Sequence, residues 1–331
     1  MTEVSEKHAG KPLLIIGGPT GAGKSDIALK IARRNNGEII SADSVAVYRG
    51  LDIGSAKPDR HMQSEVRHHL IDVLEPDEYF GIDEFVRLAS NALDEIYEAG
   101  HLPIVTGGTG FYIQALLYGI EFDDEEDHND GYREKLYKIA EEDNGPERLH
   151  LMLKDIDPDY AATVHPNNVK RVVRALEYNR HTGRLFSELN KEQRARTSPY
   201  DFLYTAIDLN REKLYERIDK RVDRMVEAGL ESEVRGLLEN GYTGDLNSMS
   251  SIGYKEMCAY ISGECSLDQA LEDIKRNSRH YAKRQLTWLK RERDVMMITR
   301  DCEYPGDEDR IVSFIEDEMR KRGMTDQNYG I

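Results

Sequence analysis

A glycine-rich segment near the N-terminus has the composition and spacing of a phosphate-binding loop. It matches the pattern G-x-x-x-x-G-K-[ST] and consists of Gly18, Pro19, Thr20, Gly21, Ala22, Gly23, Lys24 and Ser25. In such a loop, backbone N–H groups and the positive end of the following helix bind phosphate oxygens. The lysine adds a mobile charge, and the serine hydroxyl is a ligand for Mg²⁺. The segment predicts a site for a di- or triphosphate and does not decide between them.

Two more polar residues follow predicted strands. Asp43 comes directly after residues 38–42, and Thr109 lies in the glycine-rich turn after residues 102–106. Ligands of open α/β sheets bind outside the carboxyl ends of the strands, so both residues should face the phosphate site. A carboxylate there suits a water-mediated Mg²⁺ contact or proton abstraction. Helix capping is the alternative for both residues.

The turn after residues 102–106 lacks the acidic residue that most nucleoside triphosphatases have there. Most nucleoside triphosphatases place an aspartate there to hold Mg²⁺, whereas this chain has Gly107-Gly108-Thr109-Gly110. The absence argues against an ordinary ATPase or kinase.

The elements that must position these residues alternate between strand and helix. Short apolar runs at 13–16, 38–42 and 102–106 are separated by helical patterns from residue 24 and over 85–96. This order predicts an α/β fold, a P-loop NTPase-like parallel sheet flanked by helices. Strand patterns return at 202–209 and 295–299, with helices expected at 211–228, 230–239, 253–262 and 266–291.

A helical segment interrupts this pattern. Residues 121–127 carry six acids, which we interpret as a solvated boundary loop, and residues 132–196 show helical periodicity without a strand. We therefore expect a catalytic core formed by residues 1–119 and 199–331. Residues 120–198 should form an inserted all-helical domain.

The charge is distributed unevenly. The chain has 45 Lys and Arg against 62 Asp and Glu, a formal charge of −17, which by itself argues against a nucleic-acid partner. Residues 275–293 nevertheless contain eight Lys or Arg and one Glu. This local excess predicts either an RNA-binding surface or a solvated basic face.

The remaining composition limits the class of protein. No apolar run approaches the ~20 residues of a membrane span, and residues 1–11 lack a signal-peptide core. Three cysteines, Cys258, Cys265 and Cys302, have no metal-binding spacing. We expect a cytoplasmic protein that does not enter a membrane.

Several segments together resemble the tRNA dimethylallyltransferase family in its bacterial form. Besides residues 18–25, 43–44 and 107–112, they are Tyr48-Arg49-Gly50-Leu51-Asp52-Ile53-Gly54, His165-Pro166-Asn167, Arg171 with Arg174-Ala175-Leu176-Glu177, Ile252-Gly253-Tyr254-Lys255-Glu256, and residues 281–289. They occur in order from about residue 12 to 293. The order makes the set specific, although each segment alone is a weak signal.

The resemblance implies transfer of a dimethylallyl group from dimethylallyl diphosphate to the exocyclic 6-amino group of the adenosine 3′-adjacent to the anticodon. Asp43 would accept the amino proton, and Thr109 and Arg217 would stabilise the leaving diphosphate. Mg²⁺, held partly by Ser25, is the implied cofactor. From the residues alone, Arg217 is a surface helix arginine, and Arg221 is an alternative assignment.

We also expect a monomer that binds a tRNA anticodon stem-loop, and the target base must leave its stack to reach a buried phosphate site. The residues expected to contact tRNA are Asp43, Ser44, Val45, Ala46, Lys170, Arg171, Arg174, Gly253, Tyr254, Lys255, Lys283, Arg284 and Gln285. Three segments depart from the family's usual residues. Asn168-Val169-Lys170 stands where the family usually has Asp-Pro-Gln. Gly21-Ala22 stands where Ala-Ser is usual, and Ser55 where Thr is usual. Alternative functions are a P-loop small-molecule or nucleotide kinase, an RNA-binding ATPase switch, and prenyl transfer to a free adenine nucleotide.

Overall fold

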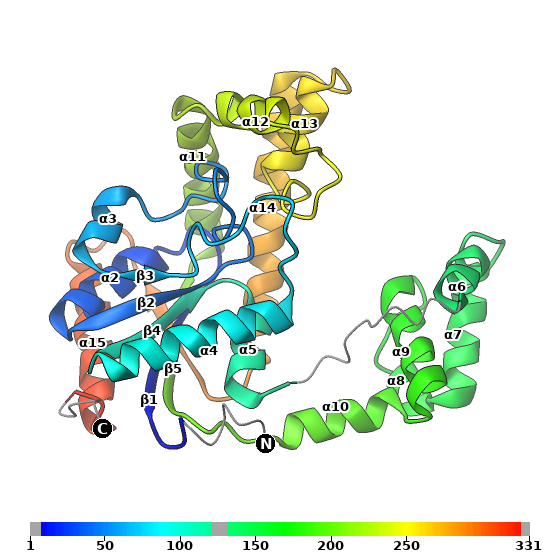
Figure 1. The fold of residues 1–331 in the computed structure, drawn as a ribbon, viewed down its shortest axis with the longest axis horizontal. Helices are drawn as coiled ribbons and strands as arrows, with labels where there is room; N and C mark the ends of the chain where they lie inside the picture. Colours follow the sequence, from blue (N-terminus) through cyan, green and yellow to red (C-terminus); the bar gives the residue numbers. More distant parts are fainter. Residues whose placement is uncertain (1–7, 121–130, 326–331) are drawn as a thin grey trace. The chain divides into compact units, whose positions relative to one another are not determined.

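The structure is a computed structural model that describes residues 8–120 and 131–325 (Figure 1). The chain divides into two compact units, one formed by Met1–Gly119 with Pro199–Ile331 and the other by Ile120–Ser198. The acidic run at 121–127 lies outside the described residues.

The larger unit contains a six-stranded sheet in the order β3-β2-β4-β1-β5-β6. All five pairs of neighbouring strands are parallel, which confirms the predicted fold class. The strands are β1 Pro12–Gly17, β2 Gly37–Ala42, β3 His68–His69, β4 Leu102–Gly107, β5 Asp201–Leu209 and β6 Val295–Arg300. Since β5 pairs with β1 from Pro12↔Asp201 to Gly17↔Ala206, the sheet continues directly where the chain returns from the helical unit.

Helices cover this sheet and bury its apolar strands. Leu13, Leu14, Ile15 and Ile16 of β1 are fully buried, as a central parallel strand requires. The helices of this unit are α2 Lys24–Arg34, α3 Arg60–Glu65, α4 Ile82–Glu98, α5 Gly110–Tyr118, α11 Arg211–Glu227, α12 Leu230–Glu239, α13 Tyr254–Ile261, α14 Leu267–Leu289 and α15 Asp307–Lys321. In Figure 1, α4 passes in front of the sheet, and α5 lies beside the end of α4.

Two helices form the core on one face of the sheet. Ile27 and Ile31 of α2 and Ile311 and Ile315 of α15 belong to one buried cluster with Leu14 and Ile16. Their spacing of four residues places each pair on one helical face. Helices α15 and α3 and the two-residue strand β3 were not predicted from the sequence.

Helices α11 to α14 extend away from the sheet in Figure 1 and meet at α12 and α13. The 23-residue α14 contacts α11, α13 and α5, so it connects this extension to the sheet. No described helix is long and apolar enough to cross a membrane.

The second unit is a helical bundle. It contains α6 Tyr132–Ala140, α7 Gly145–Ile156, α8 Pro158–Ala161, α9 Val169–Thr182 and α10 Phe186–Ala195, and its described residues include no strand. Leu136, Leu149, Val172 and Leu176 are buried in its own core. This agrees with the helical periodicity of residues 132–196.

Candidate active site at the carboxyl ends of the strands

The phosphate-binding loop connects β1 to α2 and has the backbone that its glycines predict. Gly18, Gly21 and Gly23 have φ angles of 144°, 82° and 84°, a range that L side chains rarely adopt. A Cβ on Gly18 would also lie 2.8 Å from the carbonyl oxygen of Ile207. The loop is therefore built for glycine at these positions and turns directly into the N-terminus of α2.

Lys24 folds back over this loop. Its Nζ donates a hydrogen bond of 2.9 Å to the carbonyl oxygen of Pro19. Burial and the nearby positive charge of Arg221 lower the pKa of Lys24 to about 8, and the Asp43 carboxylate acts in the opposite direction. An anionic ligand in the loop would supply the negative charge that this lysine lacks.

Asp43 ends β2 on the same side of the sheet. Its Oδ1 accepts hydrogen bonds from the backbone N–H groups of Val45, at 2.8 Å, and Ala46, at 3.2 Å. These bonds stabilise a turn, because no helix begins until Arg60, so the helix-cap alternative is wrong. Within the described residues Oδ2 has no hydrogen-bond partner. The carboxylate is thus held by one oxygen, and its charge acts on Lys24.

Thr109 precedes α5 in the position of a helix cap, but its side chain makes no capping hydrogen bond. The side chain instead interacts with the hydroxyl of Tyr281 of α14. Burial raises the pKa of the Tyr281 hydroxyl, and the Asp43 carboxylate raises it further, whereas the interaction with Thr109 lowers it. Thr109 and Asp43 are therefore both close to Tyr281, which was not predicted as a site residue.

Two arginines of α11 reach the site from a third direction. Nε of Arg217 donates a 2.7 Å hydrogen bond to the carbonyl oxygen of Gly21, so Arg217 is not a free surface arginine. A guanidinium nitrogen of Arg221 donates a 3.1 Å hydrogen bond to the carbonyl oxygen of Ser55. Burial lowers the pKa of Arg221, while Asp43 opposes this effect. Both candidates for the diphosphate-binding arginine, Arg217 and Arg221, thus face the site.

A third arginine at the loop was not found from the sequence. Arg300 ends β6, is buried, and donates a 2.9 Å hydrogen bond from Nη1 to the carbonyl oxygen of Ala22. It also pairs with Glu308 at the start of α15. A Cβ on Gly23 would lie 1.8 Å from Nη1 of Arg300, so this glycine also makes room for the guanidinium. The position of Arg300 at the carboxyl end of a predicted strand was the one feature of the sequence that could have indicated it as a site residue.

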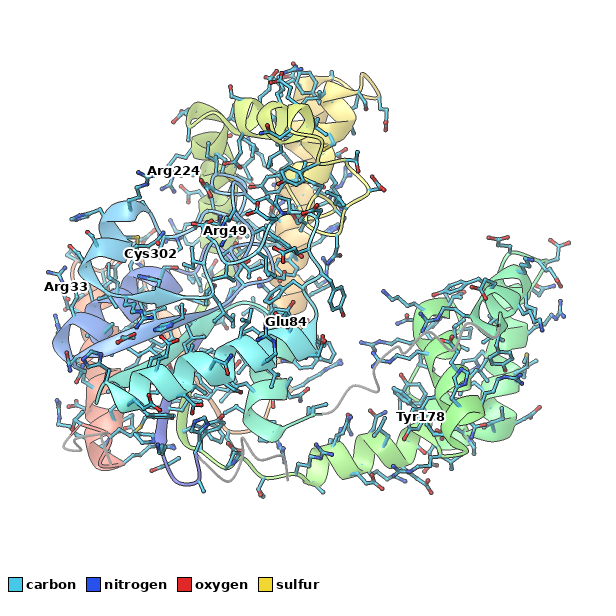
Figure 2. All side chains as sticks on the ribbon, viewed as in Figure 1. Arg33, Arg49, Glu84, Tyr178, Arg224 and Cys302 are labelled. Atoms are coloured by element: carbon cyan, nitrogen blue, oxygen red, sulfur yellow. The ribbon has the colours of Figure 1, made fainter. Side chains whose placement is uncertain are left out.

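The loop at 52–54 is held by Glu233, which was not predicted as a site residue. The Glu233 carboxylate of α12 accepts hydrogen bonds from all three backbone N–H groups of residues 52–54, at 2.7 to 3.1 Å. It also accepts one from the Tyr254 hydroxyl at 2.7 Å. In Figure 2 side chains crowd this region, where Arg49 marks the start of the loop. This loop clamp, formed by Glu233 and Tyr254, positions Ser55, the residue that Arg221 contacts.

Four residues expected to bind tRNA have buried side chains or backbones in this arrangement, and their contacts with tRNA stay predictions. Tyr254 has no exposed surface and belongs to the loop clamp, and Gly253 is buried beside it. Ala46 is 4% exposed, with its N–H bonded to Asp43. Gln285 is 7% exposed, with both ends of its amide bonded inside the protein. These positions turn inward because the same segments must shape the phosphate site.

The basic segment at 275–293 is partly neutralised. Lys275, Arg276 and Arg279 pair with Asp223, Asp273 and Asp219 at 2.6 to 2.7 Å. Lys283 and Arg284, one turn further along α14, are exposed and pair with no carboxylate of residues 8–120 or 131–325. The exposed positive charge is therefore narrower than the sequence predicts.

The other residues expected to bind tRNA lie at the surface of their units. Ser44 and Val45 are partly exposed beside Asp43, and Lys255 is exposed on α13. Lys170, Arg171 and Arg174 are exposed on α9 of the helical unit. Their contacts with RNA stay predictions.

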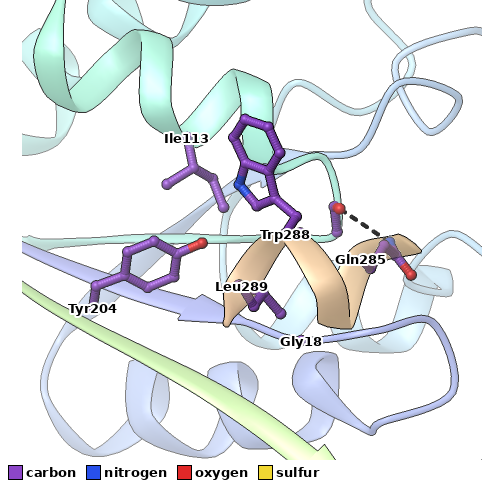
Figure 3. A pocket seen from close by; sticks show the side chains of 9 residues that line it. Gly18, Ile113, Tyr204, Gln285, Trp288 and Leu289 are labelled. Atoms are coloured by element: carbon purple, nitrogen blue, oxygen red, sulfur yellow. Dashed lines mark hydrogen bonds between the residues drawn. The ribbon is translucent and has the colours of Figure 1, made fainter. Parts of the chain in front are cut away.

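A small cavity lies beside the phosphate-binding loop (Figure 3). Two polar atoms near it, the Tyr204 hydroxyl and Nε1 of Trp288, are buried without a partner in the described structure. A Cβ on Gly110 would lie 2.2 Å from Nε1 of Trp288, so α14 packs tightly here. The cavity is lined by Gly18, Gly107, Gly108, Gly110, Ile113, Tyr204, Gln285, Trp288 and Leu289.

The described residues include no group of three or more His, Cys, Asp or Glu side chains that could hold a metal ion. Ser25 is exposed in the first turn of α2, and its hydroxyl has no hydrogen-bond partner among those residues. Mg²⁺ at phosphate sites is commonly held by one or two protein oxygens together with the phosphates. Ser25 fits this kind of site.

Comparison with known proteins gives a consistent family. A family model described as IPP transferase matches residues 46–292. A curated tRNA dimethylallyltransferase from Lachnoclostridium phytofermentans is 49% identical over 290 residues, covering 88% of this chain and 92% of the relative. One from Acetivibrio thermocellus is 47% identical over 296 residues, covering 89% and 94%.

Solved structures agree with these relatives. The full-length tRNA isopentenylpyrophosphate transferase from Bacillus halodurans superimposes with a TM-score of 0.70 at 39% identity, covering 95% of this chain and 98% of that one. A eukaryotic dimethylallyltransferase acting on tRNA gives a TM-score of 0.79 at 29% identity, covering 97% and 82%.

Proposed function

This chain belongs to the tRNA dimethylallyltransferase family, and from that premise we propose that its phosphate-binding loop holds dimethylallyl diphosphate for transfer to tRNA. The protein is a prenyltransferase, with tRNA as the substrate that its family implies. The acceptor is the exocyclic 6-amino group of the adenosine 3′-adjacent to the anticodon. One observation carries the assignment of the site: the Asp43 carboxylate lies close enough to the loop to act on the charge of Lys24.

The reaction needs a group that removes a proton from a weak nucleophile. The adenine amino nitrogen attacks C1 of the dimethylallyl group, a new C–N bond forms, and the C–O bond to the diphosphate breaks. The amino group must lose one proton, and Asp43 accepts it. Because Oδ1 of Asp43 is held by two backbone N–H groups, Oδ2 is the oxygen available for that proton.

The leaving diphosphate accumulates negative charge as the C–O bond breaks. Lys24 and the N–H groups of the loop lie where they can stabilise this charge, with Arg217 and Arg221 on a second side. Thr109 offers its hydroxyl from the turn after β4. Ser25 would hold Mg²⁺, which when bound neutralises part of the diphosphate charge.

The RNA surface has one cluster in each unit. Lys283 and Arg284 on α14, and Lys170, Arg171 and Arg174 on α9, would contact phosphates of the anticodon stem-loop. Ser44 and Val45 lie next to Asp43, where the flipped adenine would enter. We further propose that the protein acts as a cytoplasmic monomer. The kinase alternative gains no support, because β4 ends in glycine and threonine without an acidic metal ligand.

Mass spectrometry of tRNA nucleosides tests the function directly. Purified protein, unmodified tRNA, Mg²⁺ and dimethylallyl diphosphate should yield N6-dimethylallyladenosine without ATP. The same tRNA with guanosine in place of the target adenosine should gain no mass. A product at any other nucleoside, or a requirement for ATP, would contradict the proposal.

A further inference from the structure

The side chain of Gln285 joins the two loops that form the phosphate site. Its Oε1 accepts a hydrogen bond of 2.9 Å from the backbone N–H of Thr20, in the loop after β1. Its Nε2 donates one of 3.0 Å to the carbonyl oxygen of Gly108, in the turn after β4. One amide thus connects two loops that are separated by more than 80 residues of chain. Figure 3 shows the bond to Gly108.

The fit around this amide is close. A Cβ on Gly108 would lie 2.0 Å from Nε2 of Gln285, so the amide rests directly against the glycine backbone. Gln285 is 7% exposed. Removing the amide would leave the Thr20 N–H and the Gly108 carbonyl without these partners in a region that water hardly reaches.

Helix α14 carries this contact on one face and exposed cations on another. Tyr281 and Gln285, four residues apart, both point toward the phosphate loops, as their contacts with Thr109, Thr20 and Gly108 show. Lys283 and Arg284 lie between them in sequence and are exposed to solvent. A rigid helix therefore has an outward basic face directly beside its bond to the phosphate loops.

We propose that Gln285 is a positioning residue that makes the shape of the phosphate site depend on the RNA-bound position of α14. The inference rests on the proposed function, because it assumes that tRNA binds at Lys283 and Arg284. RNA held on that face restrains α14, and Gln285 passes the restraint to Thr20 and Gly108. The loops then favour the geometry that binds diphosphate. Linkage requires the reverse effect too, so diphosphate tightens RNA binding by the same factor.

The test measures the affinity of inorganic pyrophosphate with Mg²⁺, by titration calorimetry, in the absence and presence of saturating tRNA. The ratio of the two dissociation constants is the coupling. We expect about a tenfold ratio in the wild type, within the usual range for coupled sites. Gln285→Met removes both hydrogen bonds and keeps the side-chain length, and it should bring the ratio close to one.

Two further variants separate positioning from RNA contact. Gly108→Ala places a methyl group where the Gln285 amide lies, and therefore displaces the amide without changing Gln285 itself. This variant should lower the ratio in the same way as Gln285→Met. Lys283→Met, on the outward face, should weaken tRNA binding and lower the ratio only in part, because Arg284 still holds the RNA on α14. Thermal unfolding is recorded for every variant, so that Gly108→Ala replaces Gln285→Met as the deciding variant if the latter is unfolded.

The outcomes are distinguishable. A folded Gln285→Met that keeps the wild-type ratio overturns the inference. So does one that loses tRNA affinity as Lys283→Met does while its ratio stays intact, since Gln285 would then be an RNA contact. Prenyl transfer is assayed on the same wild-type sample. A wild type that transfers the prenyl group but has a ratio of one overturns the coupling and leaves the proposed function standing.

Discussion

Asp43 and Lys24 carry opposite charges at one site, and each changes what the other can do. The Asp43 carboxylate raises the pKa of Lys24, whereas burial and Arg221 lower it, with a net result of about 8. A bound diphosphate would shift this balance toward the charged lysine. Asp43 would then lie near both the charged lysine and the diphosphate. The rate should therefore depend on whether Asp43 is free to accept the amino proton of the adenine.

Replacing Asp43 by Asn should remove most turnover while tRNA and donor affinity stay close to wild type. Asparagine keeps the Oδ1 acceptor for Val45 and Ala46 but cannot accept a proton as a carboxylate does. General-base catalysis contributes about 100- to 10,000-fold, which is the decrease expected in single-turnover rate. Lys24→Ala is the comparison, because it should weaken donor binding as well. A near-normal single-turnover rate in Asp43→Asn would exclude the proton-acceptor role.

The pKa of Lys24 predicts a pH dependence that differs between kcat/KM and kcat. Before the donor binds, Lys24 loses its proton as the pH rises through about 8, so kcat/KM for the donor should fall above that pH, by up to about tenfold per unit. Bound diphosphate raises the pKa of Lys24, so kcat should stay level to higher pH. Steady-state kinetics at saturating tRNA measure both.

Lys24→Arg is the control for this assignment, because its guanidinium keeps its charge throughout the range. Its kcat/KM should be lower than wild type and level across pH 8. A fall near pH 8 that persists in Lys24→Arg would assign the titration to another group.

At the scale of elements, one face of α14 contacts the phosphate loops and another carries exposed cations. Along its length, the first cations form ion pairs with α11 and with α14 itself, whereas Lys283 and Arg284 are exposed and pair with no carboxylate of the described residues. This arrangement leaves a strongly basic segment with only a small surface of unpaired positive charge. The ion pairs instead attach α14 to α11, which holds Arg217 and Arg221.

Neutralising Lys283 and Arg284 together should weaken tRNA binding and flatten its salt dependence. The slope of log affinity against log salt should decrease by roughly 0.7 to 0.9 for each RNA phosphate that the variant no longer neutralises. Lys275→Met is the matched control, since its charge is paired with Asp223, and its slope should stay near wild type. Fluorescence anisotropy at several salt concentrations provides the slopes, with melting temperature as the check on folding. An unchanged slope in a stably folded double variant would remove this face from the RNA site.

At the scale of the whole molecule, an acidic protein presents cations in two separate units. The formal charge is −17, but charges act over only about 8 Å at physiological salt, so we expect local clusters, and not the net charge, to determine where RNA binds. The exposed cations of α9 and of α14 lie on different units. An RNA bound by both units would contact two separate surfaces, one on α9 and one on α14.

This predicts that the two clusters contribute additively to one binding event. A variant with Lys170, Arg171 and Arg174 changed to Met should lower the salt slope by an amount that adds to the decrease from the α14 double variant. The combined five-residue variant tests the sum. Should the α9 change leave the slope of the full-length protein unaltered, the helical unit would not contact the RNA backbone.

Local sequence determined much of the fold. The strands and helices around the phosphate-binding loop follow from apolar runs and 3.6-residue periodicity, and the loop geometry follows from its glycines. Asp43 and Thr109 could be placed at the site because the ends of neighbouring parallel strands meet at one edge. The two-residue strand β3 is too short to have a detectable period.

The tertiary structure alone decided which side chains face inward. Gln285 and Tyr254 lie in segments that suggest RNA contact, yet both are buried, because hydrogen-bond partners distant in sequence draw them into the protein. Arg300 reaches the phosphate loop from the last strand, and Glu233 clamps a loop about 180 residues earlier. Sequence spacing specifies which face of a helix a residue occupies, but not which element packs against that face. The packing of distant elements supplies that information.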